Sequence, residues 1–332
     1  MKHVIIKDSQ LNGWEYGMLR SFETAIAKET KAEIVEIPHY RFGSKHLHHF
    51  GQGMKRGRYR GYFPKQAFEV NSDVAWYILM GPENYKLDLY KDWIECSKVK
   101  VLYLFDTLPG QYPLIKKLVS NNTWDLLITS FIDAVDDLEK ITGRKWHCVE
   151  QGADLDLFQH IPINERLIHF SSYGRRFPVL HEILKDFCTN NKLYYDYTTH
   201  DAKHPVVDST ELYRQYAWHL SHSIFTLSWP VELTNPARAG HLNPVTCRWF
   251  EAAASGTAIL GRHPNNKAFD SYFGDKMVTD LSPESDPKIM YEKLETIWSE
   301  RESKLAMATL ARKEKLESWT WNDRVNRIIS ML

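Results

Sequence analysis

Three short segments in the first half of the chain are almost wholly apolar, at residues 74–80 (VAWYILM), 99–105 (VKVLYLF) and 125–129 (DLLIT). Short apolar strands separated by helices are typical of a parallel sheet that is covered on both faces. Further strand patterns occur at 3–7, 33–37 and 146–149, and helical spacing occurs at 14–28 and 132–141. The first half is therefore predicted to be an α/β domain.

A second alternating series begins after residue 160. Its strands are expected at 167–171, 193–197, 223–228 and 258–260, and its helices at 178–187, 210–220, 243–255, 288–299 and within 303–332. Two such series in 332 residues predict two doubly wound domains, joined near residues 154–164.

Composition narrows the function classes. The 42 basic and 42 acidic residues leave no net charge, so nucleic-acid binding is not expected. The four cysteines form no CxxC pair, which argues against a zinc site and favours reduced thiols. No apolar run is long enough for a signal peptide or a membrane span. We expect a cytoplasmic protein, with peripheral contact to the inner face of the membrane as the alternative.

Residues 243–261 carry the most specific local pattern. Asn243 can cap a helix, Pro244 suits its first turn, and Gly256 suits its end before a short apolar strand. The free N–H groups and positive dipole end of a helix N-terminus suit a phosphate. Glu251, about two turns further in, can accept hydrogen bonds from ribose hydroxyls. An ordinary amphipathic helix with an exposed Glu is the alternative.

A basic turn follows the first strand of the second series, at residues 171–176 (SSYGRR). Ligands of doubly wound sheets bind beyond the carboxyl ends of the strands. Gly174 lets the backbone approach a phosphate, and Arg175 and Arg176 can grip it bidentately. A plain surface turn is the alternative interpretation.

Other polar residues are candidates for sugar contacts and catalysis. Glu232 and Asn235 precede the 243–255 helix and can hold sugar hydroxyls. Asp106 follows the 99–105 strand and is a candidate base, an acceptor-positioning group or a helix cap. Asp154 and Asp156 form an Asp-x-Asp pair of the kind that holds a divalent metal. Their place after Gly152, at the interdomain join, favours a turn instead, so no metal site is expected.

A long segment between two expected strands, residues 41–65, is strongly basic. Loops of this length are often functional, and its charge could meet an anionic acceptor such as a lipid phosphate. A solvated variable loop is the other interpretation. Its basic residues are Arg41, Lys45, Lys55, Arg56, Arg58, Arg60 and Lys65.

Together these segments resemble GT-B glycosyltransferases of the family-four-like and spore-maturation type (group 1). Residues 248–257 (RWFEAAASGT) are similar to their R-x-F-E-A-x-A-x-G donor helix. Residues 151–158 (QGADLDLF) are similar to the N-G-V-D-x-x-x-F segment that ends their first domain, and 173–176 (YGRR) to their phosphate-gripping turn. The usual Glu-Gly-Phe-Gly loop before the helix is missing, since Glu232 stands 19 residues before Glu251.

The resemblance implies two facing Rossmann-like domains with a cleft between them. Residues 1–158 would form the acceptor domain, 159–312 the nucleotide-sugar donor domain, and 313–332 a helix that crosses back onto the first domain. The implied activity moves a sugar from a UDP- or GDP-linked donor to a carbohydrate, lipid-linked or small-molecule hydroxyl. Bacterial glycan or glycolipid synthesis, with retention at the anomeric carbon, is the expected setting.

The expected site follows from the motifs and the resemblance together. A diphosphate is expected at Gly174, Arg175, Arg176, Val245, Thr246 and Arg248. Glu251 would hold the ribose, and Glu232, Asn235 and Asn243 the donor sugar, with Asp106 and Glu232 as catalytic candidates. The helix dipole and the arginines would take the place of a metal, and no cofactor is expected. A sugar-nucleotide epimerase and a non-catalytic GT-B-like partner subunit remain alternatives.

Overall fold

The computed structural model describes residues 1–9, 11, 13, 16–38, 65–91, 93, 97–174, 176–198, 208–274, 277–284 and 286–332. The basic segment 41–64 and Arg175, both singled out above, lie outside these residues, whereas Lys65 is described and exposed. The chain divides into two compact units, Met1–Glu150 with Val325–Leu332, and Gln151–Arg324. The predicted acceptor and donor roles of the two domains stay predictions.

The first unit is built on a six-stranded sheet in the order β2-β1-β4-β6-β7-β8, and every pair in it is parallel. The two longest strands, β4 and β6, are buried along most of their length, as their apolar sequences predict. The strands are β1 (His3–Lys7), β2 (Glu33–Glu36), β4 (Ser72–Leu79), β6 (Ser97–Leu104), β7 (Leu126–Thr129) and β8 (His147–Cys148).

Aromatic side chains fill much of this unit's core, where Trp76, Tyr77, Tyr103 and Trp124 are each at most 1% exposed. Helix α1 packs on β1 and β4, and α3 packs against α4. The remaining elements are α1 (Gly17–Thr30), α3 (Tyr112–Ser120), α4 (Val135–Thr142), the 3-10 turns η4 (Pro82–Asn84), η5 (Leu87–Leu89), η6 (Pro109–Gln111) and η7 (Ile132–Ala134), and the short strand pair β3 (Gln66–Ala67) and β5 (Tyr90–Lys91).

The second unit is built on a five-stranded parallel sheet in the order β10-β9-β11-β12-β13. Its middle strand β11 is buried throughout, as the apolar pattern of residues 223–228 predicts. The strands are β9 (Ile168–Ser172), β10 (Tyr195–Tyr197), β11 (Ser223–Ser228), β12 (Ala258–Gly261) and β13 (Val278–Asp280).

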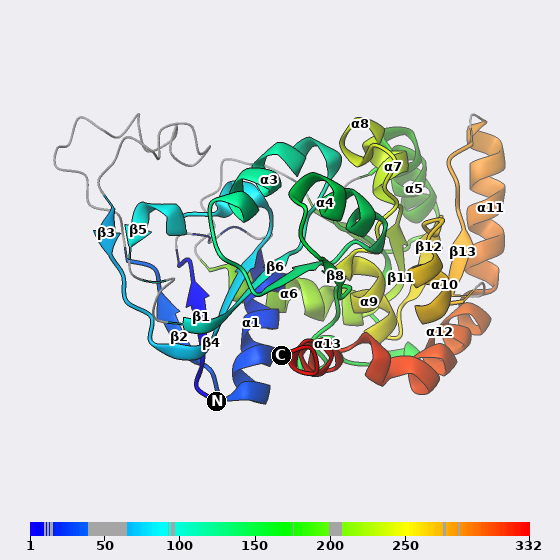
Figure 1. Cartoon of the computed structure of the whole chain (residues 1–332). Helices are drawn as coiled ribbons and strands as arrows, with labels where there is room; N and C mark the ends of the chain where they lie inside the picture. The colour runs from blue at the N-terminus through cyan, green and yellow to red at the C-terminus, as the bar shows by residue number, and fades with distance from the viewer. Residues whose placement is uncertain are drawn as a thin grey trace, which may run out of the picture. The chain divides into compact units, whose positions relative to one another are not determined.

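Helices cover this sheet, with α5 against α11, and α9 against α6, α12 and β12 (Figure 1). The helices of this unit are α5 (Pro178–Asn190), α6 (Ser209–Ser221), α7 (Val231–Thr234), α8 (Pro236–Ala239), α9 (Cys247–Ala254), α10 (Lys267–Tyr272), α11 (Pro287–Ser299) and α12 (Arg301–Lys315), with 3-10 turns η8 (Ile163–Glu165) and η9 (Leu316–Trp319). The last helix, α13 (Trp321–Ile329), begins in this unit and continues into the residues Val325–Leu332 of the first unit. The predicted fold class, α/β with two parallel sheets, is confirmed.

The start of α9 corrects one prediction. The helix expected to begin at Asn243 begins at Cys247, with Thr246 as its N-cap residue. Val245 is buried and the Cys247 N–H donates to the side chain of Gln151, so the chain before Cys247 is held outside the helix. The Asn243 cap was therefore wrong.

The end of α9 follows the prediction. Gly256 has φ +63°, in the left-handed region, and its N–H donates to the carbonyl of Ala253 at 3.0 Å. Thr257 then donates to Ala252 at 3.0 Å, which completes a glycine-terminated helix end and leads into β12.

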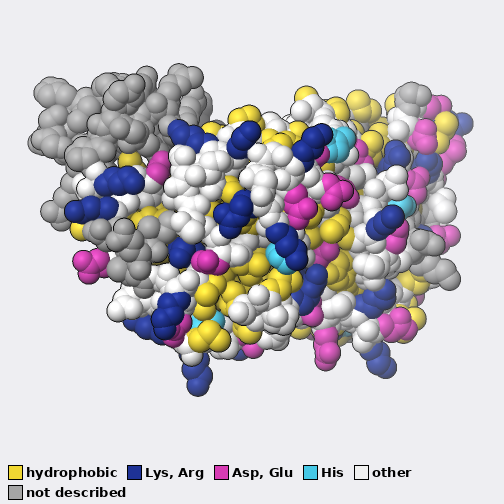
Figure 2. All heavy atoms as spheres, viewed as in Figure 1, with side chains coloured by type: hydrophobic (Ala, Val, Ile, Leu, Met, Phe, Trp, Pro, Cys, Tyr) yellow, Lys and Arg dark blue, Asp and Glu magenta, His cyan; other side chains and the backbone are white. Residues whose placement is uncertain are grey.

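The surface carries charges of both signs. Figure 2 shows Lys and Arg side chains interspersed with Asp and Glu on the face in view, in keeping with the zero net charge of the chain. Within the described ranges, every helix is too short or too polar to cross a membrane.

Candidate functional site

The site is organised by the carboxyl edge of the second sheet. Because all five strands are parallel, their carboxyl ends meet at one edge. Helix α9 reaches β12 through a tight turn and runs back along it, so its N-terminus lies at the same edge. The turn after β9 and the first turn of α9 are thereby brought together, as the sequence predicted for a diphosphate site.

Gly174 and Arg248 are in direct contact at this edge. Gly174 has φ +85°, a conformation that other residues rarely adopt. A Cβ placed there would lie 2.9 Å from Nη2 of Arg248, so the guanidinium packs on the space that a side chain would fill. The Gly174 N–H donates to Oγ1 of Thr198, at the end of β10, at 3.1 Å. Glycine is therefore required at 174 because the turn needs a positive φ, and because any side chain there would collide with the Arg248 guanidinium.

The two arginines of this edge retain unused donors. The Arg176 guanidinium lies over the Tyr197 ring, 5.2 Å from its centroid. Its Nη1 is buried and has no hydrogen-bond partner among the described residues, and the same is true of Nε of Arg248. A buried guanidinium N–H without a hydrogen-bond acceptor lowers the stability of the folded state, unless a bound anion accepts its hydrogen bond.

Glu251 lies one turn along α9 from Cys247 and is only 2% exposed. Its Oε1 accepts from the Tyr213 hydroxyl at 2.5 Å, and its Oε2 accepts from the Tyr216 hydroxyl at 2.8 Å. Burial raises the pKa of the Glu251 carboxyl, while the two hydroxyl donors and the nearby Arg248 charge oppose that rise. Glu251 is thus enclosed by a tyrosine pair and is not the exposed Glu of the alternative interpretation, and its ribose-binding role stays a prediction.

The remaining predicted sugar residues lie around the same strand ends. Glu232 is half-buried in the first turn of α7, which follows β11. Asn235 is exposed, and its side-chain oxygen caps α8 by accepting from the Arg238 N–H at 3.2 Å. Asn243 is half-buried, and its backbone carbonyl accepts from the side chain of Asn266 at 2.9 Å. Their sugar-binding roles stay predictions.

Asp106 belongs to the first unit. It follows β6 at the carboxyl edge of that sheet, is half-buried, and donates its N–H to the Met80 carbonyl at 2.6 Å. The carboxylate is thus placed where ligands of parallel sheets bind, and its catalytic role stays a prediction.

The Asp-x-Asp segment forms a turn. Oδ1 of Asp154 accepts from the Asp156 N–H at 2.9 Å, and the Asp154 carbonyl accepts from the Phe158 N–H at 2.8 Å. In the part of the chain that the structure describes, His, Cys, Asp and Glu side chains form no group of three that could hold a metal ion.

Several residues of this site were not found from the sequence. Tyr213 and Tyr216 stand three apart on one face of α6, but only the fold shows that this face meets α9. Tyr197 ends the edge strand β10 and contacts Arg176, and Thr198 directly follows the strand and accepts from the Gly174 N–H. Position could have indicated Tyr197 and Thr198, because they lie at and directly after the end of a predicted strand, whereas no sequence signal indicates the tyrosine pair.

Comparisons with known proteins agree with this architecture. A model of the glycosyl transferase-like family matches residues 162–330, just over half of the chain. No curated protein matches in sequence.

Two solved structures share the fold over nearly the whole chain. Sucrose-phosphate synthase from Thermosynechococcus elongatus has a TM-score of 0.56 at 10% identity, over 100% of this chain and 98% of that one. A glycosyltransferase from Rickettsia africae has a TM-score of 0.50 at 12% identity, over 99% and 97%. The chain therefore belongs to the glycosyl transferase-like family and is a glycosyltransferase with the GT-B fold.

Proposed function

We propose that this glycosyltransferase takes a hexosyl group from a UDP- or GDP-linked donor and transfers it to an acceptor hydroxyl without a metal ion. The donor diphosphate would lie at the carboxyl edge of the second sheet, between the turn at Gly174 and the start of α9. Bacterial glycan or glycolipid synthesis, and retention at the anomeric carbon, belong to the same proposal through the resemblance of the motifs.

One observation carries the diphosphate assignment. Nη1 of Arg176 and Nε of Arg248 are buried donors without partners in the described chain, and both arginines border the Gly174 turn. Two cations with unused N–H groups at a helix N-terminus suit a group of two negative phosphates. The same charges would stabilise the diphosphate as it leaves, which is the role that a metal plays elsewhere.

The ribose would be held next to this diphosphate. Each carboxylate oxygen of Glu251 has more than one lone pair, so it can accept from a ribose hydroxyl while it keeps its tyrosine partner. Glu232 and Asn235 would meet the donor sugar, and Asp106 would act on the acceptor side. The acceptor would be a carbohydrate, lipid-linked or small-molecule hydroxyl.

A thermal-shift panel of UDP, GDP, ADP and TDP, each with and without EDTA, tests this proposal. We expect one diphosphate to raise the melting temperature clearly, because a ligand that binds only the folded state stabilises it, and EDTA to leave the shift unchanged. Arg176→Ala and Arg248→Ala should each lower the affinity for that nucleotide by about tenfold or more, since a charge-assisted hydrogen bond is worth about 1.5–3 kcal/mol.

Arg301→Ala is the matched control. Arg301 is the first residue of α12, its guanidinium lies over the ring of Trp298 on α11, and it takes no part in the proposed site. It should bind nucleotide as the wild type does. A wild-type protein that responds to none of the four nucleotides would favour a non-catalytic partner subunit. A shift that EDTA abolishes would refute metal independence.

A further inference from the structure

We propose that Gln151 is a positioning residue for the donor diphosphate: it holds the first turn of α9 with a neutral side chain, and Arg324 fixes Gln151 in place. This inference rests on the proposed function, because it assumes that the diphosphate lies at α9. The residues that carry it come from segments far apart in sequence: near residue 151, at 319–324, and in α9 and α10.

Gln151 caps α9 from outside the helix. Its side-chain Oε1 accepts from the N–H of Cys247, the first residue of α9, at 2.5 Å, and Gln151 is 2% exposed. The first N–H groups of a helix have no partner within it, so this contact fixes where α9 begins. A glutamine does so without a negative charge, which leaves the positive end of the helix available to an anion.

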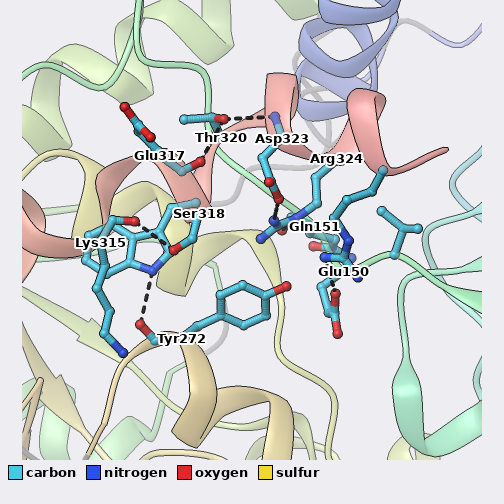
Figure 3. A network of polar contacts seen from close by, with 12 residues as sticks. Glu150, Gln151, Tyr272, Lys315, Glu317, Ser318, Thr320, Asp323 and Arg324 are labelled. Atoms are coloured by element: carbon cyan, nitrogen blue, oxygen red, sulfur yellow. Dashed lines mark hydrogen bonds and ion pairs between the residues drawn. The ribbon is translucent and has the colours of Figure 1, made fainter. Parts of the chain in front are cut away.

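Arg324 ties the backbone of Gln151 to the same helix. Its Nε donates to the Gln151 carbonyl at 3.1 Å, and Nη1 donates to Asp323 at 2.5 Å (Figure 3). The guanidinium is wholly buried and lies over the rings of Phe250 on α9 and Tyr272 on α10, at 5.2 Å and 4.8 Å. One side chain thus joins Gln151 to two helices.

The neighbouring backbone leaves Gln151 little freedom. Ala153 donates its N–H to the Trp319 carbonyl at 2.8 Å and accepts from the Trp321 N–H at 3.1 Å. A Cβ on Gly152 would lie 3.1 Å from the backbone of Thr320, so the two segments are in close contact. A backbone held at 152–153 and by Arg324 aims the Gln151 side chain at Cys247.

Gln151→Glu separates this role from a structural one. A glutamate of the same length keeps an acceptor for the Cys247 N–H, and the positive end of the helix offsets the cost of burying its charge, so the melting temperature should fall little. Its charge would repel the diphosphate, and we expect the affinity for UDP or GDP, whichever the wild type binds, to fall about tenfold or more. The affinity for the matching nucleoside, which carries no phosphate, should be unchanged.

Arg324→Lys tests whether Arg324 fixes Gln151 in place, with Arg312→Lys as its control. Arg312 donates from Nε to the Ala254 carbonyl at 2.6 Å and so holds the opposite end of α9. Both variants should lower the melting temperature. Only Arg324→Lys should lower the affinity for the nucleoside diphosphate more than the affinity for the nucleoside. The ratio of the two affinities separates positioning from general destabilisation.

Two results would overturn the inference while leaving the proposed function intact. One is wild-type diphosphate affinity in Gln151→Glu. The other is an equal loss of diphosphate and nucleoside affinity in both Gln151→Glu and Arg324→Lys. If the wild-type protein binds no nucleoside diphosphate, the proposed function itself fails and this inference fails with it.

Discussion

At the scale of single residues, Glu251 shows how a motif residue differs from its expected setting. The motif predicts a carboxylate near the diphosphate, and the contact with α6 surrounds that carboxylate with a buried pair of tyrosine hydroxyls, which the motif does not predict. Burial also raises the pKa of both tyrosines, and the Glu251 charge adds to that rise, so the hydroxyls stay protonated donors. The residue is thereby held in one orientation beside Arg248.

The raised pKa of Glu251 predicts a pH dependence of stability. Because the folded pKa lies above the ordinary value of 4.5, the folded state keeps the proton over a window that begins near pH 4.5. The contribution of Glu251 to stability is therefore complete below that pH and is lost as the pH rises through its folded pKa. Glu251→Gln cannot titrate, so the melting temperature of the wild type relative to this variant should fall from pH 4.5 to 7.

Glu295→Gln, at an exposed position on α11, is the control for this measurement. Its difference from the wild type should show no comparable fall across the same range. A Glu251→Gln difference that stayed level, or that rose with pH, would contradict a raised carboxyl pKa.

At the scale of elements, α9 is held at both ends. Gln151 accepts from its first N–H, Arg312 donates to the carbonyl of its last residue, and Arg166 donates to the two carbonyls that follow the helix. Arg166 is 6% exposed and donates from Nη2 to the Ser255 and Gly256 carbonyls, at 2.9 Å and 3.2 Å. These contacts align the helix with β12 and with the strand ends that form the site.

Arg166→Met should therefore destabilise the second unit strongly. The change removes the donor of several buried carbonyls, and a total loss of about 3 kcal/mol should lower the melting temperature by roughly 6–12 °C. Arg166→Lys, which restores part of the donor set, should recover some of the loss. Thermal unfolding followed by circular dichroism measures both, and a Met variant as stable as the wild type would show that Arg166 does not hold α9.

The sequence predicted one end of α9 better than the other for a physical reason. Gly256 acts locally, through its own φ angle, so the helix end could be inferred from one residue. The helix start depends on Gln151, 96 residues away, and no local pattern indicates that partner. Asn243 and Pro244 locally favour a helix start at 243, but the contact between Gln151 and Cys247 places the start at Cys247.

At the scale of the whole molecule, the two parallel sheets could be predicted because their central strands, β4, β6 and β11, are buried and apolar over most of their length. The position of the site at a carboxyl edge followed from that topology. The contact between residues 151–153 and 319–324 could not be predicted, because it is made by backbone hydrogen bonds, which do not depend on which side chains are present. The tyrosine pair around Glu251 depends on helix packing in the same way.

The most direct test of the account is a crystal structure of the protein with the nucleoside diphosphate that stabilises it. The account predicts phosphate oxygens within hydrogen-bond distance of Nη1 of Arg176 and Nε of Arg248, with the ribose hydroxyls on Glu251. A nucleotide bound with its phosphates away from both arginines would contradict the proposed donor site.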